Sequence, residues 1–250
     1  IGEFAWSGVY LLLLKSLTNV SYIIDEHNLE YELVKFNYGL LGKFIWPIVK
    51  FYEKFTWKFS KYIFCVSEND KKVITNLGID NKKIIVVPHG IDNNFLRKLN
   101  KKEIKRKLNL SLDDSIILFF GKLDYSPNKE AVNIIHKEIL PRILKKSKKV
   151  KFLIVGSNPP SLKHENIIFT GPVENIKNYI DASDTVINPL LHGAGARFKI
   201  LEAIACGKRV ISTSIGAGEL VNENIKDFLI IRNDWDEFTE EIIKNLPKKD

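Results

Sequence analysis

Short apolar runs rich in β-branched and aromatic residues recur along the chain, separated by longer segments in which apolar residues return every three or four positions. Runs without polar alternation are typical of parallel strands covered on both faces, and the intervening periodicity indicates helices. Residues 67–70 (Ser-Glu-Asn-Asp) follow one run and form a helix N-cap signal. The predicted strands are residues 20–24, 62–66, 84–87, 116–120, 152–155, 167–169, 185–188, 210–213 and 228–231. This alternation predicts an α/β fold with doubly wound parallel sheets and ligands at the carboxyl ends of the strands.

A lysine-rich connector separates two such α/β regions. Residues 94–110 are charged and have helical character over residues 101–108. We therefore divide the chain into an N-terminal domain, residues 1–93, and a C-terminal domain, residues 94–250. We expect the N-terminal domain to be incomplete. Because the chain begins at Ile1 rather than Met, we also expect the natural protein to begin further upstream.

Residues 36–62 are crowded with aromatic side chains and lysines. One interpretation is a pair of amphipathic helices, or a single one, packed on the sheet. The other is a basic and aromatic surface that rests on anionic lipid headgroups near a lipid-linked acceptor. No RNA-binding signature accompanies these residues, so we expect no nucleic-acid partner.

The composition is that of an ordinary globular chain, with 45% hydrophobic and 27% charged residues among 250. A formal charge of +8 suits nucleic acid, an anionic membrane or an anionic substrate, and does not choose between them. Cys65 and Cys206 lie in apolar runs without metal-binding spacing, so we expect buried free thiols. Free thiols favour a reducing compartment, and we expect a cytoplasmic protein, with peripheral attachment to the inner face of the cell membrane as a further option.

The most informative stretch is residues 190–207, where a glycine-rich turn leads from an apolar strand into a helix. A helix start offers unpaired backbone N–H groups and the positive end of the macrodipole, which suit an anion such as a diphosphate. Arg197 and Lys199 in the first turn oppose the helix dipole but suit phosphate oxygens. Glu202 follows about one turn later and can accept hydrogen bonds from paired hydroxyls. The expected apolar face of this helix consists of Phe198, Leu201, Ile204 and Ala205.

Two familiar phosphate motifs fail at this stretch. A dinucleotide fingerprint needs a third glycine where Phe198 stands. A P-loop ending at residues 207–208 would need glycine in place of Glu202 and a hydroxyl residue in place of Arg209.

The stretch instead resembles the donor site of retaining GT-B glycosyltransferases, the glycosyl transferases group 1 (family 4) class. The pattern of that family is a strand, Pro, a Gly-containing loop, and then Glu-Ala-x-Ala-x-Gly-x-x-Val-Ile. The matching positions are Pro189, Gly193, Gly195, residues 202–207 and residues 210–211. Three segments resemble the N-terminal half of the same family, namely residues 26–28 (Glu-His-Asn), 66–68 (Val-Ser-Glu) and 87–92 (Val-Pro-His-Gly-Ile-Asp).

This resemblance implies a GT-B-like architecture of two facing Rossmann-type domains, with a nucleotide-sugar bound mainly by the second. It implies a retaining hexosyltransferase that moves a sugar from a UDP- or GDP-linked donor to a glycan, lipid-linked or small-molecule acceptor, in polysaccharide or glycolipid biosynthesis. It also implies no cofactor beyond the nucleotide-sugar co-substrate and no metal. Two alternatives stay open: a GT-B nucleotide-sugar epimerase, and a non-catalytic nucleotide-sugar-binding subunit.

The resemblance also assigns roles to charged residues. Negative charge develops on the leaving diphosphate, so cations should contribute most to catalysis. Lys122 stands where the family usually has Arg, and Asn128 stands where it usually has a second cation. We expect Arg197 to supply that second charge, with Lys129 and Lys199 as the alternatives.

The family often carries two glutamates eight positions apart, and here the first position is Ala194 while the second is Glu202, assigned to the ribose hydroxyls. Backbone N–H groups of residues 194–198 would hold the sugar and the diphosphate, and Gly171 to Val173 would lie beside the base. The full set of donor-binding candidates is Gly121, Gly171, Val173, Gly193, Ala194, Gly195, Ala196, Phe198, Lys199, Glu202, Gly216 and Glu219.

His27 is the third catalytic candidate, after Lys122 and Arg197. It stands at a predicted strand terminus and would orient the acceptor or the transferred sugar; the alternative is a structural histidine bonded to its neighbours. His89 and His192 are assigned to a hinge and a loop. No Asp-x-Asp or histidine cluster suggests a metal.

Overall fold

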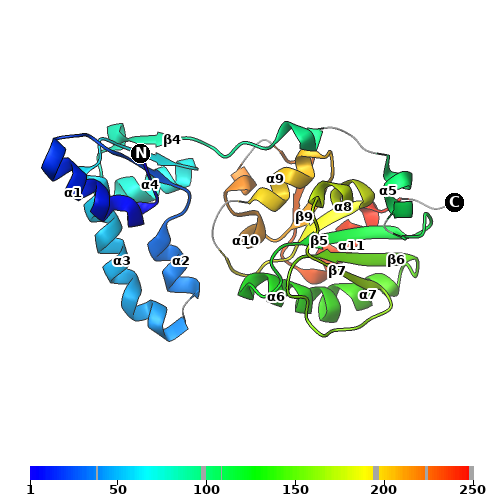
Figure 1. Ribbon diagram of the computed structural model, residues 1–250. Coiled ribbons are helices and arrows are strands. Elements are labelled where there is room, and N and C mark those ends of the chain that lie inside the picture. The colour runs from blue at the N-terminus through cyan, green and yellow to red at the C-terminus, as the bar shows by residue number, and fades with distance from the viewer. Residues whose placement is uncertain (38, 97–99, 108, 194–196, 223–224, 248–250) are drawn as a thin grey trace. The chain divides into compact units, whose positions relative to one another are not determined.

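The computed structural model describes residues 1–250 apart from residues 38, 97–99, 108, 194–196, 223–224 and 248–250 (Figure 1). Contacts group residues 1–90 in one compact unit, and residues 91–192 with 197–250 in another. Each unit is built on a wholly parallel sheet covered by helices. The α/β class predicted from the sequence is therefore confirmed.

The first unit has a four-stranded sheet in the order β1-β2-β3-β4. Its strands are β1 (Gly2–Glu3), β2 (Ile23–Glu26), β3 (Tyr62–Cys65) and β4 (Ile84–Val86). Its helices are η1 (Ala5–Ser7), α1 (Gly8–Thr18), α2 (Glu30–Asn37), α3 (Gly39–Phe59), α4 (Glu68–Asn76) and η2 (Asn81–Lys83). The predicted strand 20–24 is displaced, since β2 begins at Ile23 and includes two acidic residues. The predicted N-cap is confirmed, because Ser67 Oγ accepts a hydrogen bond of 2.9 Å from the backbone N–H of Asp70.

Among the described residues of the range 36–62, most belong to α3, which packs against this sheet as one of the two interpretations expected. The core of the unit combines strand residues Ile24 and Ile63 with Trp57 of α3, all fully buried. Glu53 of α3 is also buried, and its two carboxylate oxygens accept hydrogen bonds from the first backbone N–H groups of α2, at 2.8 Å from Glu30 and 3.0 Å from Tyr31. A side chain of α3 therefore caps the N-terminus of α2.

The second unit has a six-stranded sheet in the order β10-β9-β8-β5-β6-β7. Its strands are β5 (Ser115–Phe120), β6 (Val150–Val155), β7 (Ile167–Gly171), β8 (Thr185–Asn188), β9 (Val210–Ser212) and β10 (Leu229–Ile231). Every residue of β5 is buried, as expected for a central strand. All six strands coincide with predicted ones to within two residues at either end.

Helices cover both faces of this sheet. They are η3 (Asn93–Leu96), α5 (Lys101–Lys107), α6 (Ser126–Ile134), the π-helix η4 (Ile135–Ile139), α7 (Leu140–Leu144), α8 (Ile176–Ala182), α9 (Phe198–Ala205), α10 (Ser214–Ala217), η5 (Gly218–Asn222) and α11 (Trp235–Asn245). Figure 1 shows α6 and α7 on one side of the sheet and α8 and α9 on the other. The wider π turn precedes Pro141, whose ring lacks an N–H and crowds the carbonyl four residues earlier.

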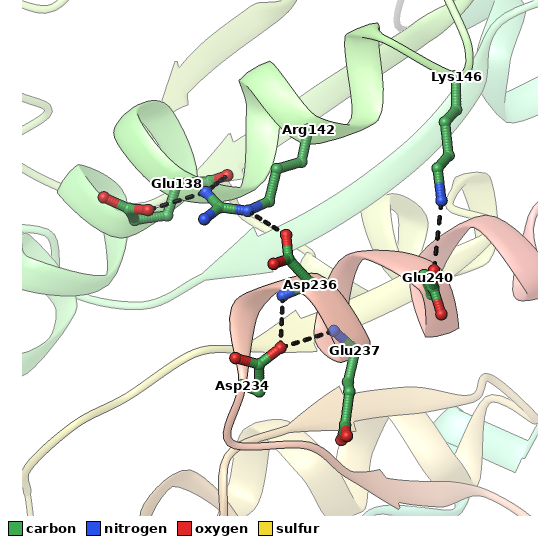
Figure 2. Close-up of polar contacts among 7 residues, drawn as sticks. All are labelled: Glu138, Arg142, Lys146, Asp234, Asp236, Glu237 and Glu240. Carbon is green, nitrogen blue, oxygen red and sulfur yellow. Dashed lines mark hydrogen bonds and ion pairs between the residues drawn. The ribbon is translucent and has the colours of Figure 1, made fainter.

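The last helix is tied to its neighbour by polar contacts (Figure 2). Arg142 donates from Nε to Asp236 at 2.7 Å and from Nη1 to Glu138 at 2.8 Å. Asp234 caps α11 by accepting from the backbone N–H groups of Asp236 and Glu237, at 2.9 and 3.0 Å. Such surface ion pairs each contribute little to stability, whereas a helix cap contributes about 1 kcal/mol.

Cys65 and Cys206 are buried free thiols, as predicted. Within the described ranges, no helix combines the length and the apolar character needed to cross a bilayer.

Candidate functional site

The order in which strands are added to the second sheet reverses beside β5. Strands β5, β6 and β7 follow one another toward one edge, and β8, β9 and β10 follow one another toward the other. The carboxyl ends of β5 and β8, which are neighbours, therefore flank a topological switch point. Gly121 follows β5, and the glycine-rich loop follows β8. Open parallel sheets bind ligands at this place, so the sequence candidates lie where ligand binding is expected.

Gly121, Asn128 and Lys199 come together at this edge. The Lys199 Nζ, from α9, donates a hydrogen bond of 2.6 Å to Asn128 Oδ1, from α6. Asn128 is buried, and its Nδ2 donates to the backbone carbonyl of Lys122 at 2.8 Å. A Cβ on Gly121 would lie only 2.9 Å from both Asn128 Nδ2 and Lys199 Nζ, and the φ of +147° also disfavours other residues. The glycine therefore leaves room for the ammonium to reach the sheet edge.

The Lys199 ammonium has no anionic partner among the residues that the structure describes. Besides Asn128, its Nζ lies 4.8 Å from the centre of the Phe119 ring, a cation–π contact. Burial, and next the charge of Arg197, lower the pKa of Lys199 to about 7. A partly buried cation of this kind is stabilised by a bound anion, because an opposite charge favours the charged form.

The side chains of Lys122 and Arg197, the two predicted catalytic cations, contact different groups. The Lys122 side chain is 69% exposed, with its Nζ 3.8 Å from Asp124 Oδ2. Arg197 donates from Nη2 to the backbone carbonyl of Ile215 at 2.9 Å. Its Nε would lie 2.6 Å from a Cβ on Gly218, whose φ is +56°. Lys199, rather than Arg197, is the cation hydrogen-bonded to Asn128.

Gly216 lies in a tightly bonded turn after β9. Its N–H donates to Thr213 Oγ1 and its carbonyl accepts from Asn188 Nδ2, both at 2.9 Å. A Cβ there would lie 2.5 Å from the Asn188 carbonyl oxygen, so only glycine fits. Asn188 Oδ1 is buried at the end of β8 with no hydrogen-bond donor in the described part of the chain. Buried acceptors are normally satisfied, so this oxygen is a candidate contact for a ligand or water.

Glu202 lies in the second half of α9 and is partly buried. Burial raises the pKa of its carboxyl. No described residue donates a hydrogen bond to that carboxylate, which fits the predicted role of accepting from ligand hydroxyls.

The prediction of which residues form the apolar face of α9 is wrong in part. The buried residues of the helix are Ile200 and Ala203, whereas Phe198 is 40% exposed. The reason is that the helix begins at Phe198 and turns the positions two and five residues later toward the sheet. Leu201, Ile204 and Ala205 are partly buried.

Gly171 ends β7 and Val173 follows it, and β6 separates this strand from β5. Gly171 has a φ of +72°, and its carbonyl accepts from the N–H of Gly156 at 3.1 Å. The Val173 side chain is partly buried against the second core of the unit, and the contact of this backbone with a base stays a prediction.

Several predicted positions fall outside the description. Ala194, Gly195 and Ala196 lie outside the described residues, although Gly193 before them is described, with a φ of +126°. Glu219 belongs to η5 by its backbone, and its side chain lies outside the description.

In the first unit, His27 is packed between two rings. Its ring lies 5.1 Å from that of Phe4 and is stacked at 5.5 Å on that of His89, while its Nε2 is 3.9 Å from Asp25 Oδ2. Burial lowers the pKa of His89, and the charge of His27 lowers it further. This pairing was not predicted, since His89 was assigned to a hinge. The available signal was that both histidines follow parallel strands, whose carboxyl ends share one sheet edge. His192, the predicted loop histidine, is paired with Glu130 at 2.9 Å in the second unit.

Family comparisons agree with both halves of the chain. A model described as glycosyl transferases group 1 matches residues 114–247, more than half of the chain. A model described as glycosyltransferase family 4 matches residues 2–95. The chain belongs to the group 1 glycosyl transferases.

Group 1 relatives include two Escherichia coli proteins. One is described as UDP-Gal:alpha-D-GlcNAc-diphosphoundecaprenol alpha-1,3-galactosyltransferase and is 28% identical over 217 residues, covering 79% of this chain and 54% of the relative. The other is the O-antigen biosynthesis glycosyltransferase WbnH, 31% identical over 187 residues, covering 72% and 48%. The chain thus spans about half the length of these curated relatives.

Solved structures place this group 1 chain in the GT-B fold. Sucrose-phosphate synthase of Thermosynechococcus elongatus superimposes with a TM-score of 0.72 at 17% identity, over 97% of this chain and 62% of that one. Anabaena HepE, in complex with UDP and glucose, gives 0.70 at 15% identity, over 96% and 66%. The predicted GT-B-like fold with two Rossmann-like units is confirmed.

Proposed function

We propose that this chain belongs to a glycosyltransferase that uses a nucleoside-diphosphate sugar, with the diphosphate bound at the switch point of the second unit. The observation that carries the proposal is the Lys199 ammonium, held by Asn128 at the carboxyl end of β5 without an acidic partner among the described residues. A diphosphate supplies the missing negative charge, and a cation aimed at it stabilises the leaving group as charge develops.

The remaining roles follow from the positions of the side chains. Lys122, exposed on the loop after β5, adds a second positive charge when the donor is bound. Glu202 accepts hydrogen bonds from the ribose hydroxyls. Arg197 holds the turn after β9 through the Ile215 carbonyl and adds to the positive potential around Lys199.

The proposed donor is UDP-linked and the proposed acceptor is lipid-linked or a glycan. Support comes from the relatives, one described as using UDP-Gal on a diphosphoundecaprenol-linked sugar and another as acting in O-antigen biosynthesis. HepE, with UDP in its structure, supports the same base. We extend the proposal to transfer of a hexose with retention of configuration, in which the acceptor attacks from the face that the diphosphate leaves.

No metal is included in this proposal. The cationic side chains are assigned the task of neutralising the diphosphate, and no group of three or more His, Cys, Asp or Glu among the described residues is placed to hold an ion.

The test is a transfer assay with the full-length protein. UDP-galactose, UDP-glucose and GDP-mannose are each supplied with lipid-linked and free-glycan acceptors, and the products are identified by mass spectrometry and by the configuration of the new bond. We expect sugar transfer from a UDP donor. Isomerisation of the donor without an acceptor would instead identify an epimerase, and tight donor binding without turnover would identify a binding subunit.

A further inference from the structure

One face of helix α3 in the first unit carries exposed apolar side chains. Phe44, Ile48, Phe51 and Phe55 are 76%, 68%, 72% and 43% exposed. They recur every three or four positions, so they form a single stripe along the helix, here called the α3 stripe. The residues of α3 that are buried lie on other faces: Gly42, Val49, Glu53, Thr56 and Trp57.

Helix α1 extends this apolar surface. The Tyr52 hydroxyl of α3 accepts from the backbone N–H of Val9 at 3.1 Å and donates to the carbonyl of Trp6 at 3.3 Å. The rings of Trp6 and Tyr52 are stacked at 5.8 Å. These contacts fix the start of α1 against α3. The large exposed apolar residues of α1 are Val9, Tyr10, Leu13, Leu14 and Leu17.

The charge around the α3 stripe is of one sign. Lys43, Lys54 and Lys58 are exposed on α3. At about 100° per residue, they fall along one flank of the stripe. The only acidic residue in α1 and α3 is Glu53, which is buried and bonded to the backbone of α2. The outward surface of both helices therefore combines apolar side chains with positive charge alone.

We infer that α1 and the α3 stripe dock the protein on an anionic membrane surface. Aromatic side chains of an amphipathic helix enter the boundary between headgroups and acyl chains, and lysines beside them contact lipid phosphates. With its 21 residues, α3 is about 30 Å long and would lie in the plane of the interface. A second copy of the same face is a poorer occupant, because it would bring the lysines of two copies together. This inference does not depend on the proposed function.

The experiment is flotation of the full-length protein with phosphatidylcholine vesicles, with and without phosphatidylglycerol. We expect binding only to the phosphatidylglycerol vesicles, and release by high salt, which screens the lysines. The triple variant Lys43→Gln, Lys54→Gln, Lys58→Gln should weaken binding on the order of 100-fold, because each lysine near the surface contributes about a fivefold effect. The double variant Phe51→Ser, Phe55→Ser should weaken it at unchanged charge.

The matched control removes three exposed lysines of the second unit, Lys145, Lys148 and Lys149, by the same change to Gln. It should leave vesicle binding close to that of the natural protein. Unchanged melting curves and UDP binding would show that the variants fold and that the donor site is intact, so this test and that of the proposed function fail separately.

Three outcomes would overturn the inference. The first is that the natural protein does not float with anionic vesicles. The second is that both lysine triples weaken binding equally. The third is that Phe51→Cys in the full-length protein is shielded from a water-soluble maleimide by another chain segment or by a second copy, detected as a dimer by light scattering.

Discussion

Lys199 and Asn128 lie 71 positions apart in the chain and share one hydrogen bond at the edge of the second sheet. The related family usually has a cation at position 128, and this chain has an amide there. The ammonium arrives instead from α9, through a gap that Gly121 leaves open. A positive charge therefore still lies beside position 128, although a different element supplies it.

Removing this charge should impair donor use. Lys199→Met keeps the length of the side chain and deletes one charge-assisted contact, which costs roughly 1.5–3 kcal/mol. We expect kcat/KM for the donor to fall about tenfold to a hundredfold. The matched control is Lys129→Met, which removes an exposed lysine beside Asn128 and should change kcat/KM little. Equal losses in the two variants would contradict the role given to Lys199.

The low pKa of Lys199 predicts a pH dependence of donor binding. Burial first, and the Arg197 charge second, lower the pKa to about 7, so the ammonium is progressively lost above that pH. The affinity for UDP should therefore fall as pH rises from 7 to 9, approaching a factor of about ten per pH unit for a single required proton. Lys199→Arg keeps its charge over this range and should flatten the profile. Calorimetric titration of UDP measures both. A flat profile in the natural protein would contradict the prediction.

At the scale of elements, β2 and α3 bury two carboxyl groups together. Glu26 ends β2 and accepts from Trp57 Nε1 at 2.7 Å, and Glu53 caps α2. Burial raises their pKa values, to about 7 for Glu26 and about 8 for Glu53, and the nearby charge of Glu26 raises the pKa of Glu53 further. The first unit accordingly buries two acidic side chains, and the neutral form of Glu26 is favoured up to neutral pH.

This burial makes stability fall as pH rises. Between pH 4.5 and 7 the folded state keeps a proton on Glu26 that the unfolded state has lost, so the free energy of unfolding decreases through that window. Glu26→Gln retains an oxygen for Trp57 and carries no charge. We expect a higher melting temperature than the natural protein at pH 8, and a weaker dependence on pH. Glu3→Gln, an exposed change in the same unit, should leave the profile as it is. A lower melting temperature for Glu26→Gln at pH 8 would count against this account.

At the scale of the whole molecule, the sequence predicts best those elements whose residue pattern follows from a single physical rule. The buried strands of the second unit are continuous β-branched runs, and they were predicted closely. Strand β2 was displaced because Asp25 and Glu26 read as the end of a strand, while in the structure they belong to it. The Lys199–Asn128 contact and the stacking of His27 on His89 could not be predicted, because they depend on how side chains far apart in sequence are oriented after folding.

The two units should respond differently to a nucleotide. The donor contacts proposed above all lie in the second unit, so UDP should slow hydrogen exchange around Gly121 to Asn128 and in α9, with little change in the sheet of the first unit. A ligand that binds only the folded state adds about 2.7 kcal/mol of stability at one hundred times its Kd, which is ample for detection. Exchange measured by mass spectrometry, with and without UDP, compares the units in one experiment. Lys199→Met should lose most of the protection at the same UDP concentration, whereas Lys129→Met should keep it. Protection confined to the first unit would move the donor site away from the switch point of the second sheet.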